Sequence, residues 1–540
     1  MTSKPNHIAT LGYFLILAVA LAGSVVLFNS TARWGIGACQ DSAVYLAGAR
    51  NIMNGLGYRG YGHMDPIIQW PPFFPFSLAV LGKFGLDPLV GARYLHVALF
   101  GINIFLAGFI LKKLTRSTPI ALLGSYLMLT STANIEIHSM AWSEPWFIFL
   151  AFLGFFLLSQ YLGGRPKSFL IAASLLNALA CLDRYAGVSV IASGTLMIGL
   201  LHQKNLLNRL KDGLIYIVLT TLPLGLWLFR NFLVDQKLVN RSLSFHLPPQ
   251  KYFTEAVETL SSWVLYERFP PQWGHAALIF EVVMVTLISF LVFRKEIKDR
   301  TFKVFSADEG LRFVGCMAIF AVCNTGLELA HLMFMNLHAN ANDRHFILFF
   351  VAGLLSFLII VHRLLRSAPK PRLLAGTTLV FLALLCVSTY VSSSNLLRII
   401  SRQGSDHTSR RWQKSPTLGL VRSLPQDAVI YANDPSIVYV ITNHNAFRLP
   451  RKYGSRRHAL TEQETQKNTK LAAKLKKIEK KLGKKDGYLV FLDKQLRWFK
   501  LSEADVEKHI PITLVERFSD GSIYKIGARH DLESPKTKSL

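Results

Sequence analysis

Long apolar blocks recur along this chain from the N-terminus to about residue 394 and then cease. Each block holds roughly twenty apolar residues, which is the length that a helix needs to cross the hydrocarbon core of a bilayer. The composition agrees, because 51% of the residues are hydrophobic and only 17% are charged, whereas soluble globular chains carry about 25% charged residues. The blocks predict a polytopic α-helical membrane bundle.

We place about eleven transmembrane helices in residues 1–400, the predicted transmembrane domain. Residues 401–540 lack such blocks and are predicted to form a small α/β domain. The predicted spans are residues 12–28, 89–111, 118–133, 145–162, 169–182, 185–201, 214–229, 276–293, 313–330, 346–361 and 373–391.

Basic residues orient these spans. Cytoplasmic loops of membrane proteins are enriched in Lys and Arg, and here these residues gather in alternate connections while the intervening ones carry far fewer. The N-terminus and the basic connections are therefore predicted to be cytoplasmic, and eleven spans put the C-terminal domain outside the cytoplasmic (inner) membrane. The basic connections are 112–116, 165–167, 204–211, 294–303 and 363–372.

The first outer connection, about 29–88, is long and polar. From Asp41 to Asn54 its apolar residues recur at helical spacing, which predicts a short helix on the membrane surface. Residues 70–76 then contain three prolines, which do not fit the interior of a regular helix. The apolar run that follows is too short to span, so we interpret it as an interfacial helix.

Charged residues also mark the outer ends of later spans, around Glu144, Arg184, Arg230 and Arg344. A transporter is expected to bury such charges at mid-membrane, in broken helices. Charges that all fall on one side favour a one-sided active site that faces outward.

Six motifs, taken in order and with this sidedness, resemble the GT-C glycosyltransferase superfamily, and most closely its bacterial protein-mannosyltransferase-like and aminoarabinose-transferase-like branches of the family 39 type. The resemblance continues into the C-terminal domain and so spans nearly the whole chain. The motifs are Asp41-Ser-x-x-Tyr45…Ala49-Arg50…Asn54-Gly55, Pro71-Pro72-x-x-Pro75, Ser143-Glu144-Pro145, Asp183-Arg184-Tyr185, Trp227…Arg230-Asn231 and Asp343-Arg344.

The resemblance implies sugar transfer from a polyprenyl-phosphate-linked donor to an acceptor outside the cytoplasmic membrane, with inversion at the anomeric carbon. Such an enzyme needs a base for the acceptor hydroxyl and cations for the departing phosphate. Asp41 is the expected base, and Glu144 is the expected second catalytic carboxylate, which either orients the acceptor or binds a sugar hydroxyl. Arginines at outer span ends suit a phosphate at headgroup depth. The residues predicted to bind the donor phosphate are Arg184, Arg230, Arg344 and His345, and those predicted to line the substrate site are Tyr45, Arg50, Trp70, Pro72 and Trp142.

Each assignment has a structural alternative. Asp41 is also a good helix N-cap residue, and Glu144 before Pro145 also suits the first turn of a helix. Arg184 and Arg344 fit equally well as interfacial charges, and Arg230 as a side chain that snorkels at its span end.

No metal or other cofactor is predicted, because the outer-face histidines lack the tight spacing of metal ligands. A divalent cation, as in oligosaccharyltransferase relatives, is the alternative, with His138 near Glu136 as its first candidate ligand.

Within the C-terminal domain, residues 428–432 and 487–492 read as buried strands. Residues 512–517 and 522–526, separated by Asp520-Gly521, read as a hairpin. Between the two buried strands, 462–485 is a lysine-rich helical segment. The formal net charge of +27 does not indicate nucleic acid, because the domain carries no recognised nucleic-acid motif and is predicted to lie outside. Its lysines fit anionic lipid headgroups, an acidic glycan or simple solvation.

The sequence thus predicts a hexosyl- or pentosyltransferase whose partners are the bilayer, a polyprenyl-phosphate sugar and an envelope acceptor. A glycolipid, a polysaccharide and a protein hydroxyl all fit as the acceptor. A polytopic lipid or sugar transporter and a non-catalytic membrane scaffold are the alternatives.

Overall fold

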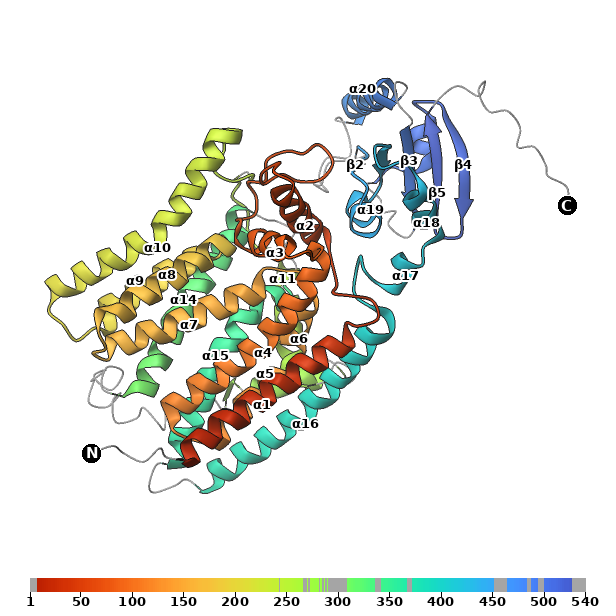
Figure 1. The fold of residues 1–540 in the computed structure, drawn as a ribbon. Coiled ribbons are helices and arrows are strands. Elements are labelled where there is room, and N and C mark those ends of the chain that lie inside the picture. The colour runs from red at the N-terminus through yellow and green to blue at the C-terminus, as the bar shows by residue number, and fades with distance from the viewer. Residues whose placement is uncertain are drawn as a thin grey trace. The chain divides into compact units, whose positions relative to one another are not determined.

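The structure is a computed structural model that describes residues 7–526 apart from 242, 266–269, 271, 281, 284–285, 287–288, 290–307, 336–340, 367–371, 451–463, 483–486 and 494–499. The chain forms two compact units (Figure 1). The first unit contains Met1–Ile36 and Pro66–Arg402, and the second contains Gly37–Asp65 and Gln403–Leu540. Residues 37–65, which the sequence placed within the transmembrane domain, therefore group with the C-terminal region.

The first unit is entirely helical in its described elements. Seven of its described helices, α1, α4, α7, α10, α14, α15 and α16, are long and apolar enough to cross a membrane. The helices are α1 (His7–Ser30), α3 (Phe73–Lys83), α4 (Pro88–Thr115), α5 (Thr118–Thr130), α6 (Thr132–Ser139), α7 (Glu144–Leu162), α8 (Lys167–Asp183), α9 (Gly187–Leu201), α10 (Leu206–Asp235), α11 (Gln250–Val264), α14 (Glu309–Phe334), α15 (Asp343–Arg366) and α16 (Arg372–Gln403).

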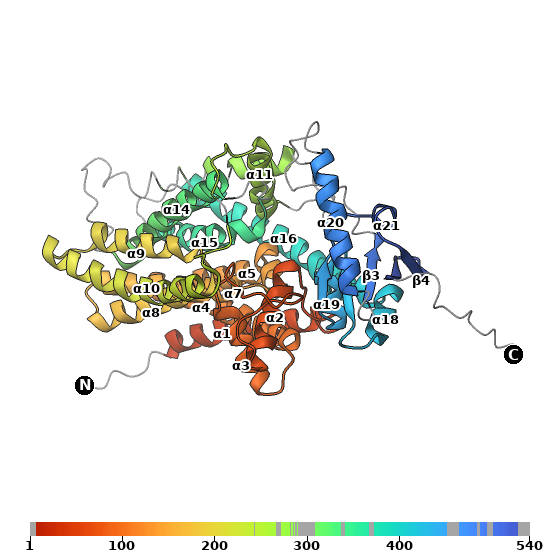
Figure 2. The same cartoon turned by 90° about the horizontal axis from the view of Figure 1, so that it is seen from above.

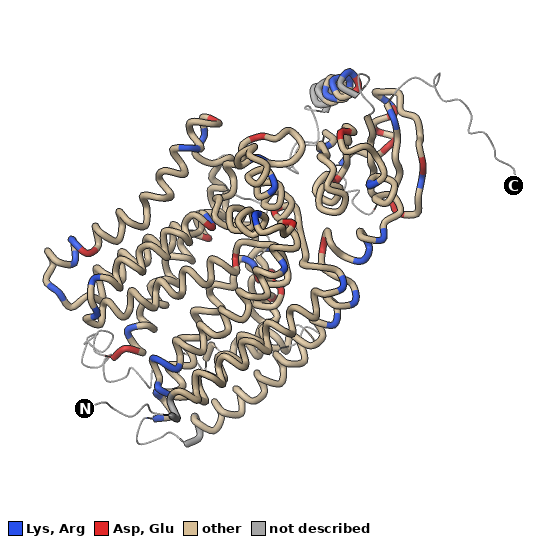
Figure 3. Tube along the Cα trace, viewed as in Figure 1, with Lys and Arg blue, Asp and Glu red and all other residues tan. Residues whose placement is uncertain are grey.

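These helices confirm the helical fold class and cover most of the predicted spans. The predicted span 118–133 is not straight, because α5 and α6 meet at a bend of 56°. Half of the predicted span 276–293 lies outside the described residues. The number of crossings, predicted as about eleven, stays a prediction. Charged residues lie mainly near the ends of the long helices and leave their middles apolar (Figure 3).

The second unit begins with α2 (Gln40–Met53), the helix predicted after Asp41, and continues after residue 402 as an α/β domain. Its five strands follow the order β2-β1-β3-β5-β4. β1 pairs in parallel with β2 and β3, whereas β5 pairs antiparallel with β3 and β4. The predicted hairpin is confirmed as β4–β5. The strands are β1 (Val429–Ala432), β2 (Ala446–Arg448), β3 (Gly487–Leu492), β4 (Ile512–Phe518) and β5 (Gly521–Ile526).

Helices cover both faces of this sheet (Figure 2). One face packs Leu418 and Val421 of α18 and Ile437 of α19 against β1 and β3. The other face packs Leu471, Leu475 and Ile478 of α20, and the described lysines of that helix, Lys474, Lys476, Lys477 and Lys480, are exposed. The helices are α17 (Arg410–Gln413), α18 (Pro416–Ser423), α19 (Pro435–Thr442), α20 (Glu464–Leu482) and α21 (Glu503–Glu507).

Candidate active site

Three of the predicted site residues meet in the first unit, in a group that we call the Glu144 cluster: Glu144, Arg184 and Arg344. Arg184 Nη1 forms an ion pair with Glu144 Oε1, and Arg344 Nε donates a hydrogen bond to the same oxygen. The side chain of Glu144 is only 3% exposed, whereas those of Arg184 and Arg344 are 24% and 18% exposed. Two half-buried cations thus converge on one buried carboxylate oxygen.

Helix ends bring these side chains together. Glu144 is the first residue of α7, Arg184 directly follows α8, and Arg344 is the second residue of α15. The negative charge of Glu144 at the start of α7 suits the positive end of the helix dipole. The first turn also accommodates Pro145, because no backbone hydrogen-bond donor is needed there. This confirms that Glu144 begins a helix, and the same residue also binds both arginines.

The three side chains of the cluster do not balance in charge. Glu144 carries one negative charge against two guanidinium groups, so the cluster has a net charge of +1. Arg184 also donates from Nη1 to Ser143 Oγ at 3.1 Å, and Arg344 lies over the Trp142 ring at 4.7 Å. Guanidinium groups held in this way by a carboxylate and an aromatic face are well placed to bind an anion such as a phosphate.

Arg230 lies in a different group. It donates to the backbone oxygen of Ile67 and to Asn231 Oδ1, both at 3.1 Å, and lies over the Trp227 ring at 4.8 Å. Tyr185, from the predicted Asp-Arg-Tyr motif, donates to the oxygen of Ile68 at 2.7 Å. Both side chains therefore fix the backbone that leads to Trp70 and Pro72. Arg230 thus contacts that segment, while its predicted role at the donor phosphate stays a prediction.

The remaining predicted site residues of this unit lie outside the Glu144 cluster and the Arg230 group. His345 Nδ1 lies 3.0 Å from Asn342 Oδ1 at the start of α15. Pro72 precedes α3, and Phe73 packs edge-on against Trp146 with ring centroids 5.5 Å apart. Trp70 is half-buried.

Asp41, Tyr45 and Arg50 belong to the second unit. The N-cap of α2 is Cys39, so the alternative that Asp41 is the N-cap residue is wrong. Asp41 is instead the second helical residue, a position where a carboxylate is stabilised by the helix dipole, and it is half-buried. Tyr45 is buried at 3% exposure. Arg50 lies over the ring of Tyr439 with its guanidinium carbon 5.3 Å from the centroid.

Sequence reasoning gave no role to Asp183, the last residue of α8. Its side chain is buried, and neither carboxylate oxygen has a hydrogen-bond partner among the described residues. A carboxylate at the negative end of a helix is also disfavoured by the dipole. The Asp-Arg pair was visible in the sequence, but nothing in it distinguished a buried acid from an interfacial one.

Within the described residues, no three or more His, Cys, Asp or Glu side chains form a group that could hold a metal ion. His138, the first candidate ligand for the alternative cation, is buried between Asn103 and the backbone oxygen of Asn134, at 3.0 and 2.8 Å. Both of its ring nitrogens are therefore already engaged.

No protein-family model and no curated protein matches the sequence. Solved structures do match the fold. ArnT from Cupriavidus metallidurans bound to undecaprenyl phosphate is similar with a TM-score of 0.56 and 12% identity, over 96% of this chain and 98% of that one. The archaeal oligosaccharyltransferase AglB from Archaeoglobus fulgidus, in complex with an inhibitory peptide and a dolichol-phosphate, is similar with a TM-score of 0.52 and 12% identity, over 96% of this chain and 75% of that one.

The chain has the GT-C fold. The predicted fold class is confirmed by this match and by the helices described above. In this fold, the residues of the Glu144 cluster lie in the first turns of α7 and α15 and directly after α8.

Proposed function

We propose that this chain is an inverting membrane glycosyltransferase. It transfers a hexosyl or pentosyl group from a polyprenyl-phosphate-linked donor to an envelope acceptor on the outer face of the cytoplasmic membrane. The GT-C fold over nearly the whole chain supports the reaction class. The Glu144 cluster is the observation that carries the proposal, because it offers two oriented guanidinium groups to a departing phosphate.

The proposed reaction is a single displacement. The acceptor hydroxyl oxygen bonds to the anomeric carbon of the donor, and the bond between that carbon and the phosphate oxygen breaks. Asp41 takes the hydroxyl proton, so that the acceptor attacks as an incipient alkoxide. The bonding electrons leave with the phosphate as polyprenyl phosphate, whose added negative charge Arg184 and Arg344 stabilise.

Glu144 acts in this proposal by orienting the two arginines. Its buried Oε1 atom binds both guanidinium groups, so neither has to be ordered when the donor arrives. Tyr45, Arg50, Trp70, Pro72 and Trp142 remain proposed lining residues, and no metal is assigned a role. The C-terminal domain is proposed to lie outside the cytoplasm, as the distribution of basic loops predicts.

The first experiment is mass spectrometry of envelope glycolipids and glycoproteins from a deletion strain, complemented with the wild type or with Asp41→Asn. We expect one species to lack a sugar in the deletion strain and to regain it with the wild type only. Removal of a general base lowers rates by about 10²–10⁴-fold, so the Asp41→Asn strain should resemble the deletion strain at equal expression.

Two results would count against the proposal. An unchanged envelope in the deletion strain would favour the transporter or scaffold alternatives. Full restoration by Asp41→Asn would leave a transferase in place but remove Asp41 from its mechanism. Asp87→Asn is a matched control, because Asp87 is the N-cap of α4 and its carboxylate accepts from the backbone nitrogen of Leu89.

A further inference from the structure

The segment that carries Asp41 is joined to the C-terminal sheet domain within the second unit. Ala38, three residues before Asp41, forms a parallel β-bridge with Asp406. The backbone nitrogen of His407 donates to the oxygen of Ala38 at 2.8 Å. The chain therefore enters α2 along a short backbone edge supplied by residues 406 and 407.

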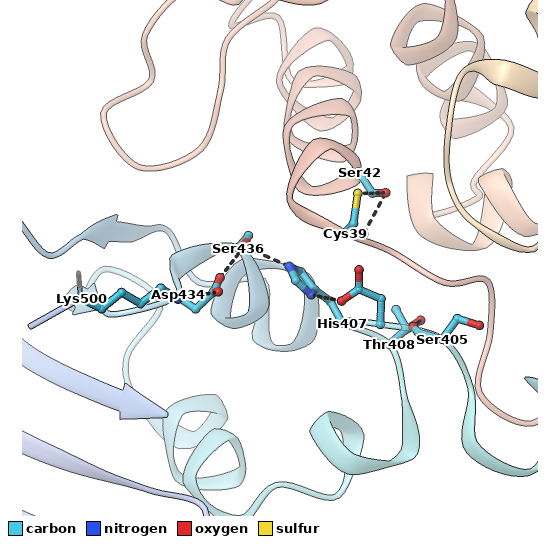
Figure 4. A network of polar contacts seen from close by, with 9 residues as sticks. Cys39, Ser42, Ser405, His407, Thr408, Asp434, Ser436 and Lys500 are labelled. Atoms are coloured by element: carbon cyan, nitrogen blue, oxygen red, sulfur yellow. Dashed lines mark hydrogen bonds and ion pairs between the residues drawn. The ribbon is translucent and has the colours of Figure 1, made fainter. Parts of the chain in front are cut away.

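The side chain of His407 fixes this edge to α19 (Figure 4). Its Nδ1 atom lies 2.8 Å from Asp406 Oδ1, and its Nε2 atom lies 3.1 Å from Ser436 Oγ. Ser436 donates to Asp434 Oδ1 at 2.5 Å, and Lys500 Nζ donates to Asp434 Oδ2 at 3.1 Å. We call these five residues the His407 network.

The edge needs this support because its backbone is unusual. Asp406 has a φ of +46°, in the left-handed region, where a residue other than glycine carries an intrinsic cost. His407 is 7% exposed, so its imidazole is buried between the turn at Asp406 and α19 and contacts both. Truncation of the ring would leave the backbone donor of His407 in the chain but would release the turn that aims it at Ala38.

A second anchor holds the other end of the same segment. The ring of Tyr61 stacks on Tyr439 of α19 with centroids 4.8 Å apart and planes 13° apart, and Arg50 of α2 also lies over Tyr439. The backbone nitrogen of Gly62 donates to Asn445 Oδ1 at 3.4 Å. Gly62 has a φ of +75°, and a Cβ there would lie 3.0 Å from the oxygen of Ala446, which explains the glycine.

Both anchors use one face of α19. Ser436 and Tyr439 are three residues apart, and side chains at this spacing lie next to each other on a helix surface. Ser436 contacts the ring of His407, and Tyr439 contacts Tyr61 and Arg50. A single short helix of the C-terminal domain therefore fixes α2 close to its start and the chain beyond its end.

We propose that His407 is a positioning residue that fixes the placement of α2, and with it Asp41, by locking the 406–407 edge onto α19. The C-terminal domain is then part of the transfer machinery rather than an appended module. The catalytic consequence rests on the proposed role of Asp41, whereas the anchoring of α2 does not.

The test compares His407→Ala with His444→Ala in the full chain, purified in lipid nanodiscs. His444 is also buried in this domain, but its ring bonds to the backbone oxygens of Thr442 and Leu424 and does not contact the 37–65 segment in any described bond. Hydrogen exchange of peptides covering 38–53 is the readout, with β3 peptides as the internal reference. We expect exchange in 38–53 to rise about tenfold in His407→Ala only, as the loss of a buried hydrogen bond predicts.

Conservative variants separate the two bonds of the ring. His407→Asn retains an amide donor near the Nδ1 position for Asp406, and His407→Gln retains one near the Nε2 position for Ser436. We expect Gln to restore slow exchange in 38–53 more fully than Asn, because only the Ser436 bond reaches α19. If His407→Ala does not fold, Ser436→Ala removes the same contact with a smaller loss of volume.

Equal exchange in His407→Ala and His444→Ala, or unchanged exchange of 38–53 in His407→Ala, would overturn the anchoring. Sugar incorporation in the complemented deletion strain then tests its consequence, with an expected loss of about tenfold for His407→Ala at wild-type expression. If Asp41→Asn restores the sugar fully while His407→Ala loosens α2, the proposed catalysis fails and the anchoring stands.

Discussion

The Glu144 cluster and the His407 network are both buried polar groups, but they differ in how the oxygens of their central carboxylates are bonded. In the first, two arginines share one oxygen of Glu144, and the other oxygen is buried with no hydrogen-bond partner among the described residues. In the second, Ser436 and Lys500 each donate to a different oxygen of Asp434, and both nitrogens of His407 lie close to oxygens. The first cluster has an excess of positive charge, which is typical of a ligand site; in the second the polar side chains bind one another, which is typical of a structural joint.

The largest effect expected from this contrast is that of Glu144→Gln. The amide keeps the shape but removes the charge that opposes two guanidinium groups, and breaking a buried ion pair costs about 3 kcal/mol or more. We expect sugar incorporation to fall about 100-fold, as measured by mass spectrometry in the complemented deletion strain. Asp434→Asn is the matched change in the His407 network and should retain far more incorporation at equal expression. Equal losses in the two variants would remove the distinction between ligand site and joint.

A smaller effect is expected from Arg344→Lys and Arg184→Lys. Lysine keeps the charge but lacks the planar fork that binds a phosphate through two parallel hydrogen bonds. We expect the Kd for undecaprenyl phosphate, measured with purified protein in nanodiscs, to rise about tenfold in each variant. Lys500→Arg keeps a cation beside Asp434 and should leave this Kd unchanged. Wild-type affinity in both arginine variants would place the phosphate elsewhere.

The sequence predicted those elements whose signal is local. The apolar blocks gave most of the long helices, the spacing after Asp41 gave α2, and Asp520-Gly521 gave the β4–β5 hairpin. The break between α5 and α6 contains no proline or glycine, so nothing in the sequence indicated the bend and the predicted span 118–133 continued across it.

Contacts between side chains that are far apart in the sequence could not be predicted from the sequence. Glu144 and Arg344 are 200 residues apart, and helix-end placement predicted each residue separately without predicting that they share an oxygen with Arg184. The His407 network joins residues 406, 407, 434, 436 and 500, which are ordinary polar types in unremarkable segments. The grouping of residues 37–65 with the C-terminal region has the same origin, because it depends on contacts with α19 rather than on any local pattern.

The pH dependence of the His407 network provides a third test. Burial alone would raise the pKa of Asp434, but the Lys500 ammonium and the Ser436 hydroxyl outweigh it, so the pKa lies below its usual value. A lowered carboxyl pKa stabilises the fold above the unfolded value of about 3.9, and this contribution is lost as the pH falls through the folded pKa. We expect the free energies of unfolding of wild type and Asp434→Asn to differ by about 2 kcal/mol at pH 7 and to converge as the pH falls through the folded pKa of Asp434.

This difference can be measured by hydrogen exchange of β3 peptides in the full chain between pH 5 and 8, with intrinsic rates corrected for pH, and by the acid-unfolding midpoint below that range. A constant difference down to pH 2 would mean that Asp434 is not the titrating group. Glu144→Gln should leave β3 exchange unchanged throughout, because Glu144 belongs to the other unit.

The smallest effect is expected at the second anchor, where Tyr61→Phe and Tyr61→Ala divide stacking from hydrogen bonding. Burial raises the pKa of Tyr61 to about 12, so its hydroxyl stays neutral at pH 7 and its loss removes no charge. Tyr61→Phe keeps the ring on Tyr439 and should change exchange of 38–53 less than threefold. Tyr61→Ala removes the stack, which contributes about 0.5–1.5 kcal/mol beyond the buried area, and should raise that exchange about fivefold. If Phe and Ala behave alike, the hydroxyl rather than the ring holds this end of the segment, and the two anchors on α19 are both polar joints.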